Sequence, residues 1–226
     1  MLYTETIVRD NIRNREGRRV FYLGPGDTLT PGARDWLQRE RIEIRSADQA
    51  KPDGFRLLGG GFLAEKPEHM THLNAEILVP KTHPRIRFRG SMDTLEAELI
   101  LAQIAAPQAA PQLEEILQLA RRILRCDVLN EPLEDITLCG LTESQLRHRS
   151  HFPQEFYGIA HFMPTAADGS AMAQLNRARC AAREAELWAA EAFADREGNP
   201  TRSDLLRAMN RLSSMLYILM LEEKSR

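Results

Sequence analysis

The 226-residue chain contains little cysteine, few aromatic residues and no long apolar run. Its three cysteines, Cys126, Cys139 and Cys180, stand far apart, so the sequence offers neither a disulfide framework nor a CxxC pair for zinc. The most apolar run, 215–221, is far shorter than the ~20 residues that span a bilayer. The N-terminus shows no basic segment followed by an apolar stretch, which argues against a signal peptide. We therefore expect a cytoplasmic protein that makes no membrane contact.

The sequence also lacks a strong excess of either charge. The formal net charge is −2, with 43% apolar and 27% charged residues, which is typical of an ordinary globular protein. This balance argues against a general affinity for nucleic acid, although a local basic patch could still bind an anion. The sequence contains no GxxxxGK[ST] motif, no dinucleotide fingerprint and no GxSxG elbow. Several common nucleotide and hydrolase sites are thereby excluded.

Hydrophobic periodicity divides the chain into three regions. Residues 1–64 predict a small α+β module, with strands near 20–24 and 42–45 and a short helix capped by Thr30 and running to Arg39. Residues 65–90 contain several prolines among basic side chains and predict an extended, partly ordered loop. Residues 91–226 predict a mainly α domain, a bundle of four to five helices.

Helical spacing also predicts the main helices of the third region. The first begins at Ser91 as its cap and ends near Pro107, and the second begins at Pro111. Two longer helices follow over about 170–195 and 203–222.

One of these long helices carries Arg179, Arg183 and Glu186 at i, i+4 and i+7. At about 100° per residue the three side chains point the same way, beside a strip of alanines suited to close packing. A solvated charged face with helical ion pairs would explain the pattern. The alternative is an anion site in which a carboxylate holds two guanidiniums, whose planar forks suit polyphosphate.

The last helix carries a polar strip of Asn210, Ser213, Ser214 and Tyr217 on an otherwise apolar sequence. Buried Asn and Ser need hydrogen-bond partners, so the strip serves either helix–helix contacts or a nucleotide. Both alternatives remain open from the residues alone.

The basic loop before the bundle could close over a phosphate chain or could be an ordinary solvated loop. His69 and His72 lack a third ligand at suitable spacing, so we predict no metal site there. Asp93 falls in the first turn of the predicted helix, where the helix dipole alone would explain a carboxylate.

Taken in order, four stretches resemble the ATP:cobalamin adenosyltransferases, most closely the ethanolamine-utilisation branch. They are Lys66-Pro-Glu-His-Met-Thr-His-Leu, Lys81-Thr-His-Pro-Arg-Ile-Arg-Phe-Arg-Gly-Ser-Met-Asp, Arg179-xxx-Arg183-xx-Glu186 and Asn210-Arg-Leu-Ser-Ser. Each stretch alone is weak, but four in this order on a helical bundle are specific. The resemblance covers most of the chain and implies transfer of the 5′-deoxyadenosyl group of ATP to a reduced corrinoid.

The resemblance also implies roles for individual residues. The residues that match ATP-contacting positions are Lys66, Thr71, His72, Lys81, Arg183 and Asn210. The residues that match the catalytic set are Asp93, Arg179, Arg183 and Glu186.

Within that set, Asp93 and Arg179 match a carboxylate–guanidinium pair that supports the corrin site and the subunit contact. Glu186 matches a carboxylate that orders the arginines and the nucleotide. Phe152, in an irregular segment, is the candidate for the apolar side chain that removes the lower axial ligand of the corrinoid; ordinary core packing is the alternative.

Two departures from the family pattern affect the expected cofactors. Ser214 stands where many relatives outside this branch have Asp. Many ethanolamine-type members carry a histidine followed by a Cys-Cys-x-x-Cys cluster that binds a divalent metal, whereas the corresponding segment here, 51–64, has no cysteine. We therefore expect a variant without a metal cluster, which needs only ATP with Mg²⁺ and the corrinoid substrate.

The family implies that a Co(I) centre attacks C5′ of ATP and triphosphate leaves, so the protein supplies alignment and charge stabilisation rather than a nucleophile. The expected partners are a reductase that supplies electrons and further copies of the chain, as a trimer by preference or a dimer; association with a bacterial microcompartment stays open. A non-catalytic corrinoid carrier on the same scaffold and a purely structural helical adaptor are the alternatives.

Overall fold

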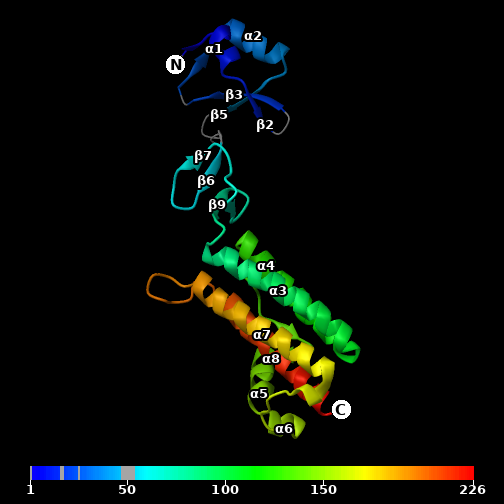
Figure 1. Cartoon of the computed structure of the whole chain (residues 1–226). Helices are drawn as coiled ribbons and strands as arrows, with labels where there is room; N and C mark the ends of the chain where they lie inside the picture. Colours follow the sequence, from blue (N-terminus) through cyan, green and yellow to red (C-terminus); the bar gives the residue numbers. More distant parts are fainter. Residues whose placement is uncertain (1, 16–17, 25, 47–53) are drawn as a thin grey trace. The chain divides into compact units, whose positions relative to one another are not determined.

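The computed structural model describes residues 2–15, 18–24, 26–46 and 54–226. The chain divides into two compact units (Figure 1). The first comprises Met1–Phe55 and Phe62–Glu65, and the second comprises Arg56–Gly61 and Lys66–Arg226.

The first unit is a small α+β module. Its elements are β1 (Leu2–Tyr3), α1 (Glu5–Asp10), β2 (Arg13–Arg15), β3 (Arg18–Leu23), β4 (Thr28–Leu29), α2 (Pro31–Arg39), β5 (Glu43–Ser46) and β7 (Phe62–Leu63). Strand β3 pairs antiparallel with β2 and parallel with β5, so the chain crosses over between β3 and β5 through α2. Val8, Phe21 and Leu37 are central to its apolar core. The predicted helix is confirmed: the Oγ1 of Thr30 accepts the Ala33 amide at 3.3 Å.

The segment 65–90 is not the extended, partly ordered loop that the sequence predicts, because it forms two strands and the start of a helix. Strands β8 (Met70–His72) and β9 (Ile77–Pro80) pair antiparallel, and β9 also pairs in parallel with β6 (Phe55–Leu57). The side chain of Asn74 accepts the amides of Glu76 and Ile77 at 3.0 and 2.9 Å, which fixes the turn between β8 and β9. We call β8, this turn and β9 the hairpin.

The first long helix, α3 (Pro84–Ala105), begins two turns before the predicted cap at Ser91. His83 is the true cap, and its Nδ1 accepts the Arg85 amide at 3.2 Å. Pro84 occupies the first turn, where its fixed φ suits a helix and its missing N–H is not needed. Ser91 lies inside the helix and donates its hydroxyl to the Phe88 carbonyl at 2.7 Å. Proline therefore opens this helix rather than interrupting a loop.

The second unit is a helical bundle, which confirms the predicted mainly α class. After α3 come η2 (Pro107–Ala109), α4 (Ala110–Leu129), β10 (Thr137–Leu138), β11 (Leu141–Thr142), α5 (Glu143–His151), α6 (Pro153–Tyr157), η3 (Ala166–Asp168), α7 (Gly169–Ala192) and α8 (Ser203–Lys224). Helix α3 packs on α4 and α7, and α8 packs on α7 and α5 (Figure 1). None of the described helices is long and apolar enough to cross a membrane.

Small side chains let the helices of the bundle approach closely. The α7 positions Ala178, Ala182, Ala185 and Ala189 are all fully buried, as the alanine strip in the sequence indicates. Because α7 contributes methyl groups at these positions, the larger core side chains come from its neighbours, such as Leu95 of α3. The charged residues Arg179, Arg183 and Glu186 lie on the face of α7 beside these alanines.

Candidate functional site

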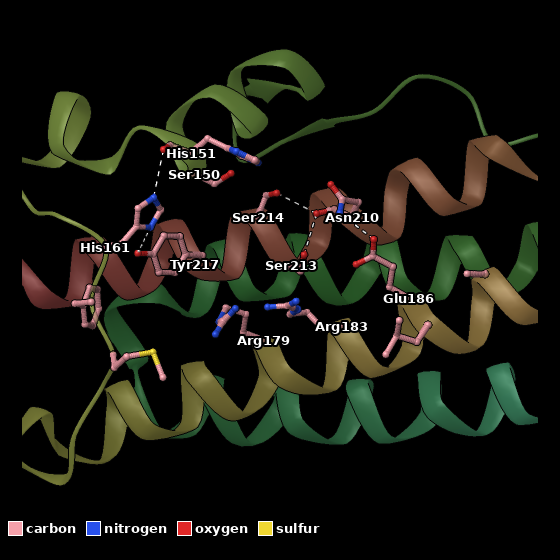
Figure 2. A pocket seen from close by; sticks show the side chains of 14 residues that line it. Ser150, His151, His161, Arg179, Arg183, Glu186, Asn210, Ser213, Ser214 and Tyr217 are labelled. Carbon is pink, nitrogen blue, oxygen red and sulfur yellow. Dashed lines mark hydrogen bonds between the residues drawn. The ribbon is translucent and has the colours of Figure 1, made fainter.

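A cavity of about 630 Å³ lies between α7 and α8 (Figure 2). Its floor carries Arg179, Arg183 and Glu186 of α7, and its opposite wall carries the polar strip of α8. The end of α5 and the segment 161–163 also line the cavity. The predicted sharing of one helical face by the three charged residues is therefore confirmed.

The two arginines of the cavity have N–H groups without hydrogen-bond acceptors among the described residues. Arg183 is exposed and makes no hydrogen bond or ion pair with any residue that the structure describes. Arg179 is half-buried, donates weakly to Asn176 at 3.4 Å and lies over the ring of Tyr217 at 5.8 Å. The Nε–H of Arg179 is buried without an acceptor among the described residues. A buried donor left unpaired costs about 1–3 kcal/mol, so an anionic ligand would satisfy a group that the protein leaves open.

Glu186 is held by Asn210 rather than by the arginines. The Nδ2 of Asn210 donates to Glu186 Oε1 at 2.8 Å, which joins α7 to α8 across the cavity. The buried guanidinium of Arg211 donates in turn to Asn210 Oδ1 and to the Glu143 carbonyl. Burial lowers the pKa of Arg211, although a guanidinium stays protonated throughout the physiological range. The expected carboxylate–arginine contact is not seen among the described residues, and the amide orients the carboxylate instead.

The two serines of the strip direct their protons to their own helix. The hydroxyls of Ser213 and Ser214 both donate to the Asn210 carbonyl at 3.0 Å, so each keeps its lone pairs as acceptors. Asn210 makes the interhelical bond that one of the two alternatives predicted, and it also lines the cavity. The other alternative, contact with a nucleotide, stays a prediction.

An aromatic wall completes the cavity, and sequence reasoning missed half of it. The imidazole Nδ1 of His161 lies 3.0 Å from the Tyr217 hydroxyl, and the two rings are stacked with 14° between their planes. The other ring nitrogen, Nε2, lies 3.3 Å from the His151 carbonyl (Figure 2). His161 stands in an irregular segment, where no periodic pattern indicates which way a side chain points.

The other predicted site residues lie outside this cavity. Lys66, Thr71, His72 and Lys81 belong to the hairpin and its flanks, and none of them lines the cavity. Asp93 is exposed on α3 and makes no ion pair with Arg179 within the described chain.

Phe152 occupies a neighbouring apolar site. Its side chain is 55% exposed and lines a smaller cavity of about 450 Å³. His151 and His161 line both cavities, so the apolar cavity and the arginine-bearing one share a boundary. Phe152 and the charged face of α7 thus lie on either side of His151 and His161.

The comparisons with known proteins agree on one family. The model of the family described as cobalamin adenosyltransferase matches residues 62–223, which include the hairpin and both cavities. The corrinoid adenosyltransferases EutT of Salmonella typhimurium and of Escherichia coli K12 are each 32% identical over 242 residues, covering 96% of this chain and 90% of each relative. No solved structure matches the chain with statistical significance.

Proposed function

The chain belongs to the cobalamin adenosyltransferase family, and from this premise we propose that it transfers the 5′-deoxyadenosyl group of ATP to a reduced corrinoid. The observation that carries the proposal is the pair Arg179 and Arg183, which both line the cavity. Among the described residues, neither the Nε–H of Arg179 nor the guanidinium of Arg183 has an acceptor. A chain of phosphates supplies several acceptors of the required charge, and guanidinium forks bind them in pairs.

The charge of the cavity favours a polyphosphate. Two guanidiniums face one carboxylate, Glu186, so the described ionised groups of the wall leave an excess of positive charge. Glu186 accepts from Asn210 and makes no ion pair with either arginine among the described residues, so neither guanidinium is neutralised by a direct contact. The adenosyl group needs acceptors and an aromatic surface, which the serine hydroxyls and the ring of Tyr217 offer.

The reaction requires no protein nucleophile. The electron pair of Co(I) attacks C5′, the bond between C5′ and the bridging oxygen breaks, and its electrons leave with triphosphate. The protein aligns the three atoms and stabilises the charge that grows on the leaving oxygen. We assign this stabilisation to Arg183 and to Lys66 and Lys81, the lysines that flank the hairpin. ATP enters as its Mg²⁺ complex.

The site is completed by a second copy of the chain. Thr71 and His72 of the hairpin, and Lys81 next to it, do not line the cavity of their own chain, although the family match includes both the hairpin and the cavity. In a closed homotrimer, each hairpin covers the cavity of the next copy, and the exposed Asp93 meets Arg179 of its neighbour. A dimer with the same exchange is the alternative arrangement.

The corrinoid lies on the Phe152 side of the shared histidines. An aromatic side chain that is more than half exposed beside an apolar cavity offers a surface for a large ring system. This arrangement puts the corrin face near Phe152 and the triphosphate near Arg183, with C5′ between them.

The protein works without a resident metal cluster in this proposal, because the segment 51–64 has no cysteine. Residues 51–53 of that segment lie outside the described residues. We further propose that a separate reductase supplies the electron and that the product serves ethanolamine catabolism.

An anaerobic assay tests the proposal. Protein, ATP, Mg²⁺ and chemically reduced cobalamin should give light-sensitive adenosylcobalamin and triphosphate in equal amounts. Omitting the corrinoid should abolish triphosphate release, which separates the reaction from plain ATP hydrolysis. Corrinoid binding without triphosphate release would refute the proposed transfer.

A further inference from the structure

Asp127 is the least exposed charged side chain that the structure describes. It lies in the last turn of α4 with a relative exposure of 0%, outside the cavity and outside every role assigned above. A carboxylate is disfavoured at the C-terminal end of a helix by the helix dipole, and a buried carboxylate is costly unless cations pair with it. Helix stability therefore does not explain why an acidic residue stands here.

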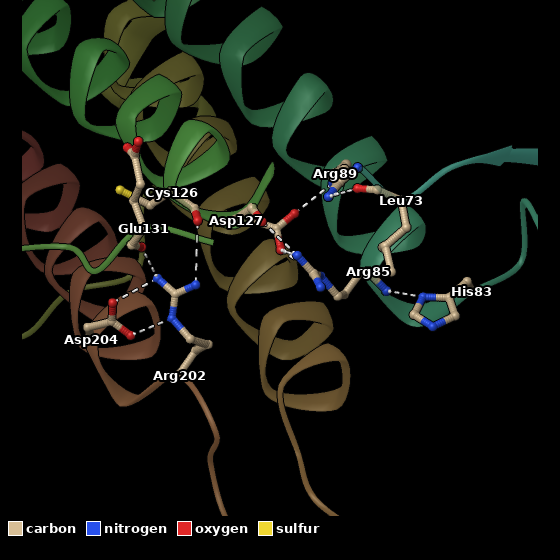
Figure 3. Close-up of polar contacts among 9 residues, drawn as sticks. All are labelled: Leu73, His83, Arg85, Arg89, Cys126, Asp127, Glu131, Arg202 and Asp204. Atoms are coloured by element: carbon tan, nitrogen blue, oxygen red, sulfur yellow. Dashed lines mark hydrogen bonds and ion pairs between the residues drawn. The ribbon is translucent and has the colours of Figure 1, made fainter. Parts of the chain in front are cut away.

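Two arginines of α3 satisfy this carboxylate (Figure 3). The Nε of Arg85 donates to Asp127 Oδ1 at 2.7 Å, and the Nε of Arg89 donates to Oδ2 at 2.6 Å. They are four residues apart on the first turns of the helix, so both reach the same partner. Each oxygen of Asp127 thus fixes one guanidinium.

The second arm of each guanidinium points to a different part of the chain. The Nη2 of Arg85 donates to the backbone carbonyl of Asp127 itself, at 2.6 Å. The Nη2 of Arg89 donates to the carbonyl of Leu73, at 2.8 Å, in the turn of the hairpin. Both arginines bind the Asp127 carboxylate, and Arg85 makes further contacts with the bundle through the Asp127 carbonyl and the ring of Phe193. Of the two side chains, only that of Arg89 also donates to a carbonyl of the hairpin.

The carbonyl that Arg89 holds belongs to an ordered turn. Leu73 is 3% exposed, and its amide donates to the Ile77 carbonyl at 2.8 Å. His72 directly precedes it, and the Lys81 amide at the other end of the hairpin donates to the His69 carbonyl at 2.9 Å. A displacement of Leu73 would therefore move the backbone on which His72 and Lys81 are carried.

We propose that Asp127 and Arg89 are positioning residues that hold the hairpin in the orientation needed to bind the triphosphate of ATP. This inference rests on the proposed function, in which the hairpin contacts ATP. Asp127 orients the Arg89 fork, the fork holds Leu73, and neither side chain touches a substrate. The pair sets the affinity for ATP and leaves the corrinoid site unchanged.

The matched arginines give a direct test. Lysine keeps the charge but has no planar fork, so the lysine of Arg89→Lys can no longer donate to the Asp127 carboxylate and the Leu73 carbonyl together. We expect the KM for ATP to rise about tenfold or more in Arg89→Lys, while the KM for the corrinoid stays within about twofold of the wild type. Arg85→Lys loses at least as many contacts with the bundle but no side-chain bond to the hairpin, so it should leave the KM for ATP within about twofold of the wild type. Equal effects of the two substitutions, or no effect of either, would overturn the inference.

A second measurement keeps the test independent of turnover. Hydrogen exchange at the Leu73 and Lys81 amides, without ATP, should be faster in Arg89→Lys than in Arg85→Lys. Unchanged exchange in Arg89→Lys would count against the inference. Should Arg89→Lys fail to fold, Asp127→Asn should raise the KM for ATP in the same direction; an unchanged KM overturns the inference. A wild-type protein that makes no adenosylcobalamin would refute the proposed function instead, whereas the exchange result would still stand.

Discussion

Replacing Arg183 by alanine should remove most of the activity and almost none of the stability. The side chain is exposed and makes no contact with any described polar group, so its loss breaks no native interaction. Alanine is also the better helix former, so the free energy of unfolding should change by no more than about 0.5 kcal/mol. A hydrogen bond from a charged donor contributes about 1.5–3 kcal/mol, and each 1.4 kcal/mol is tenfold, so kcat/KM for ATP should fall about 10- to 150-fold.

The assay is steady-state formation of adenosylcobalamin over a range of ATP concentrations. A rise in KM at constant kcat would place the contact in the ground state, and a fall in kcat would place it in the transition state. Arg207→Ala is a matched control, because Arg207 is an exposed arginine of α8 that does not line the cavity and lies 3.9 Å from Asp135. Its kcat/KM should stay at the wild-type value.

The reasoning would be refuted by an Arg183→Ala protein whose kcat/KM for ATP lies within about threefold of the wild type. It would be refuted equally by a large loss of stability, since that would mean that Arg183 acts through the fold. The kcat/KM of Arg183→Lys should lie between those of the wild type and Arg183→Ala, because lysine keeps the charge but lacks the planar fork of arginine.

Three further outcomes follow from the site and the fold. If the hairpin and the cavity come from different copies, mixing and reassembling the impaired Lys81→Ala and Arg183→Ala chains should restore wild-type activity at about one quarter of the sites. No recovery would place the site within one chain. Asp204, whose pKa is lowered to about 2 chiefly by its hydrogen bonds from Arg202, adds stability that is complete above its ordinary pKa and is lost as the pH falls through about 2. Urea unfolding should therefore show Asp204→Asn about 1–2 kcal/mol less stable at pH 6, with the difference shrinking towards pH 2; a constant difference would contradict this linkage. Thr142→Ala removes a capping box with Gln145 and should cost about 1 kcal/mol of unfolding free energy, which a chemical denaturation curve would detect or exclude.

The charged face of α7 could be predicted because helix geometry is regular. Once the segment is helical, the spacing of Arg179, Arg183 and Glu186 fixes their common direction. Which partner each side chain takes could not be predicted, because partners come from other helices. The bond between Glu186 and Asn210 links residues 24 positions apart, and no local pattern encodes it.

The region before the bundle was mispredicted because its prolines have two possible roles. Proline breaks a helix interior but is favoured in the first turn, and Pro84 occupies that position. In a helix that begins at Pro84, Arg85 and Arg89 have i, i+4 spacing and share one face. They belong to a buried ion cluster, whereas the sequence alone groups them with the basic loop.

The aromatic wall shows a different limit of sequence reasoning. Tyr217 lies on α8 and could be placed by periodicity, whereas His161 lies in a segment without regular structure. Their stacking depends on the path of that segment over α8. Such a contact between an irregular segment and a helix requires the folded chain.

The partners of the arginines limit where a triphosphate can bind. Asp127 engages Arg85 and Arg89, so these two cations of the basic region serve the fold. The cations proposed for the phosphates are then Lys66 and Lys81 around the hairpin and the arginines Arg179 and Arg183 of the cavity. A leaving group with several negative charges needs both sets, but no residue of the hairpin lines the cavity of its own chain. Assembly of copies is therefore the step that we expect to create the active site, and a variant that folds as a monomer should lose adenosyl transfer while keeping the bundle intact.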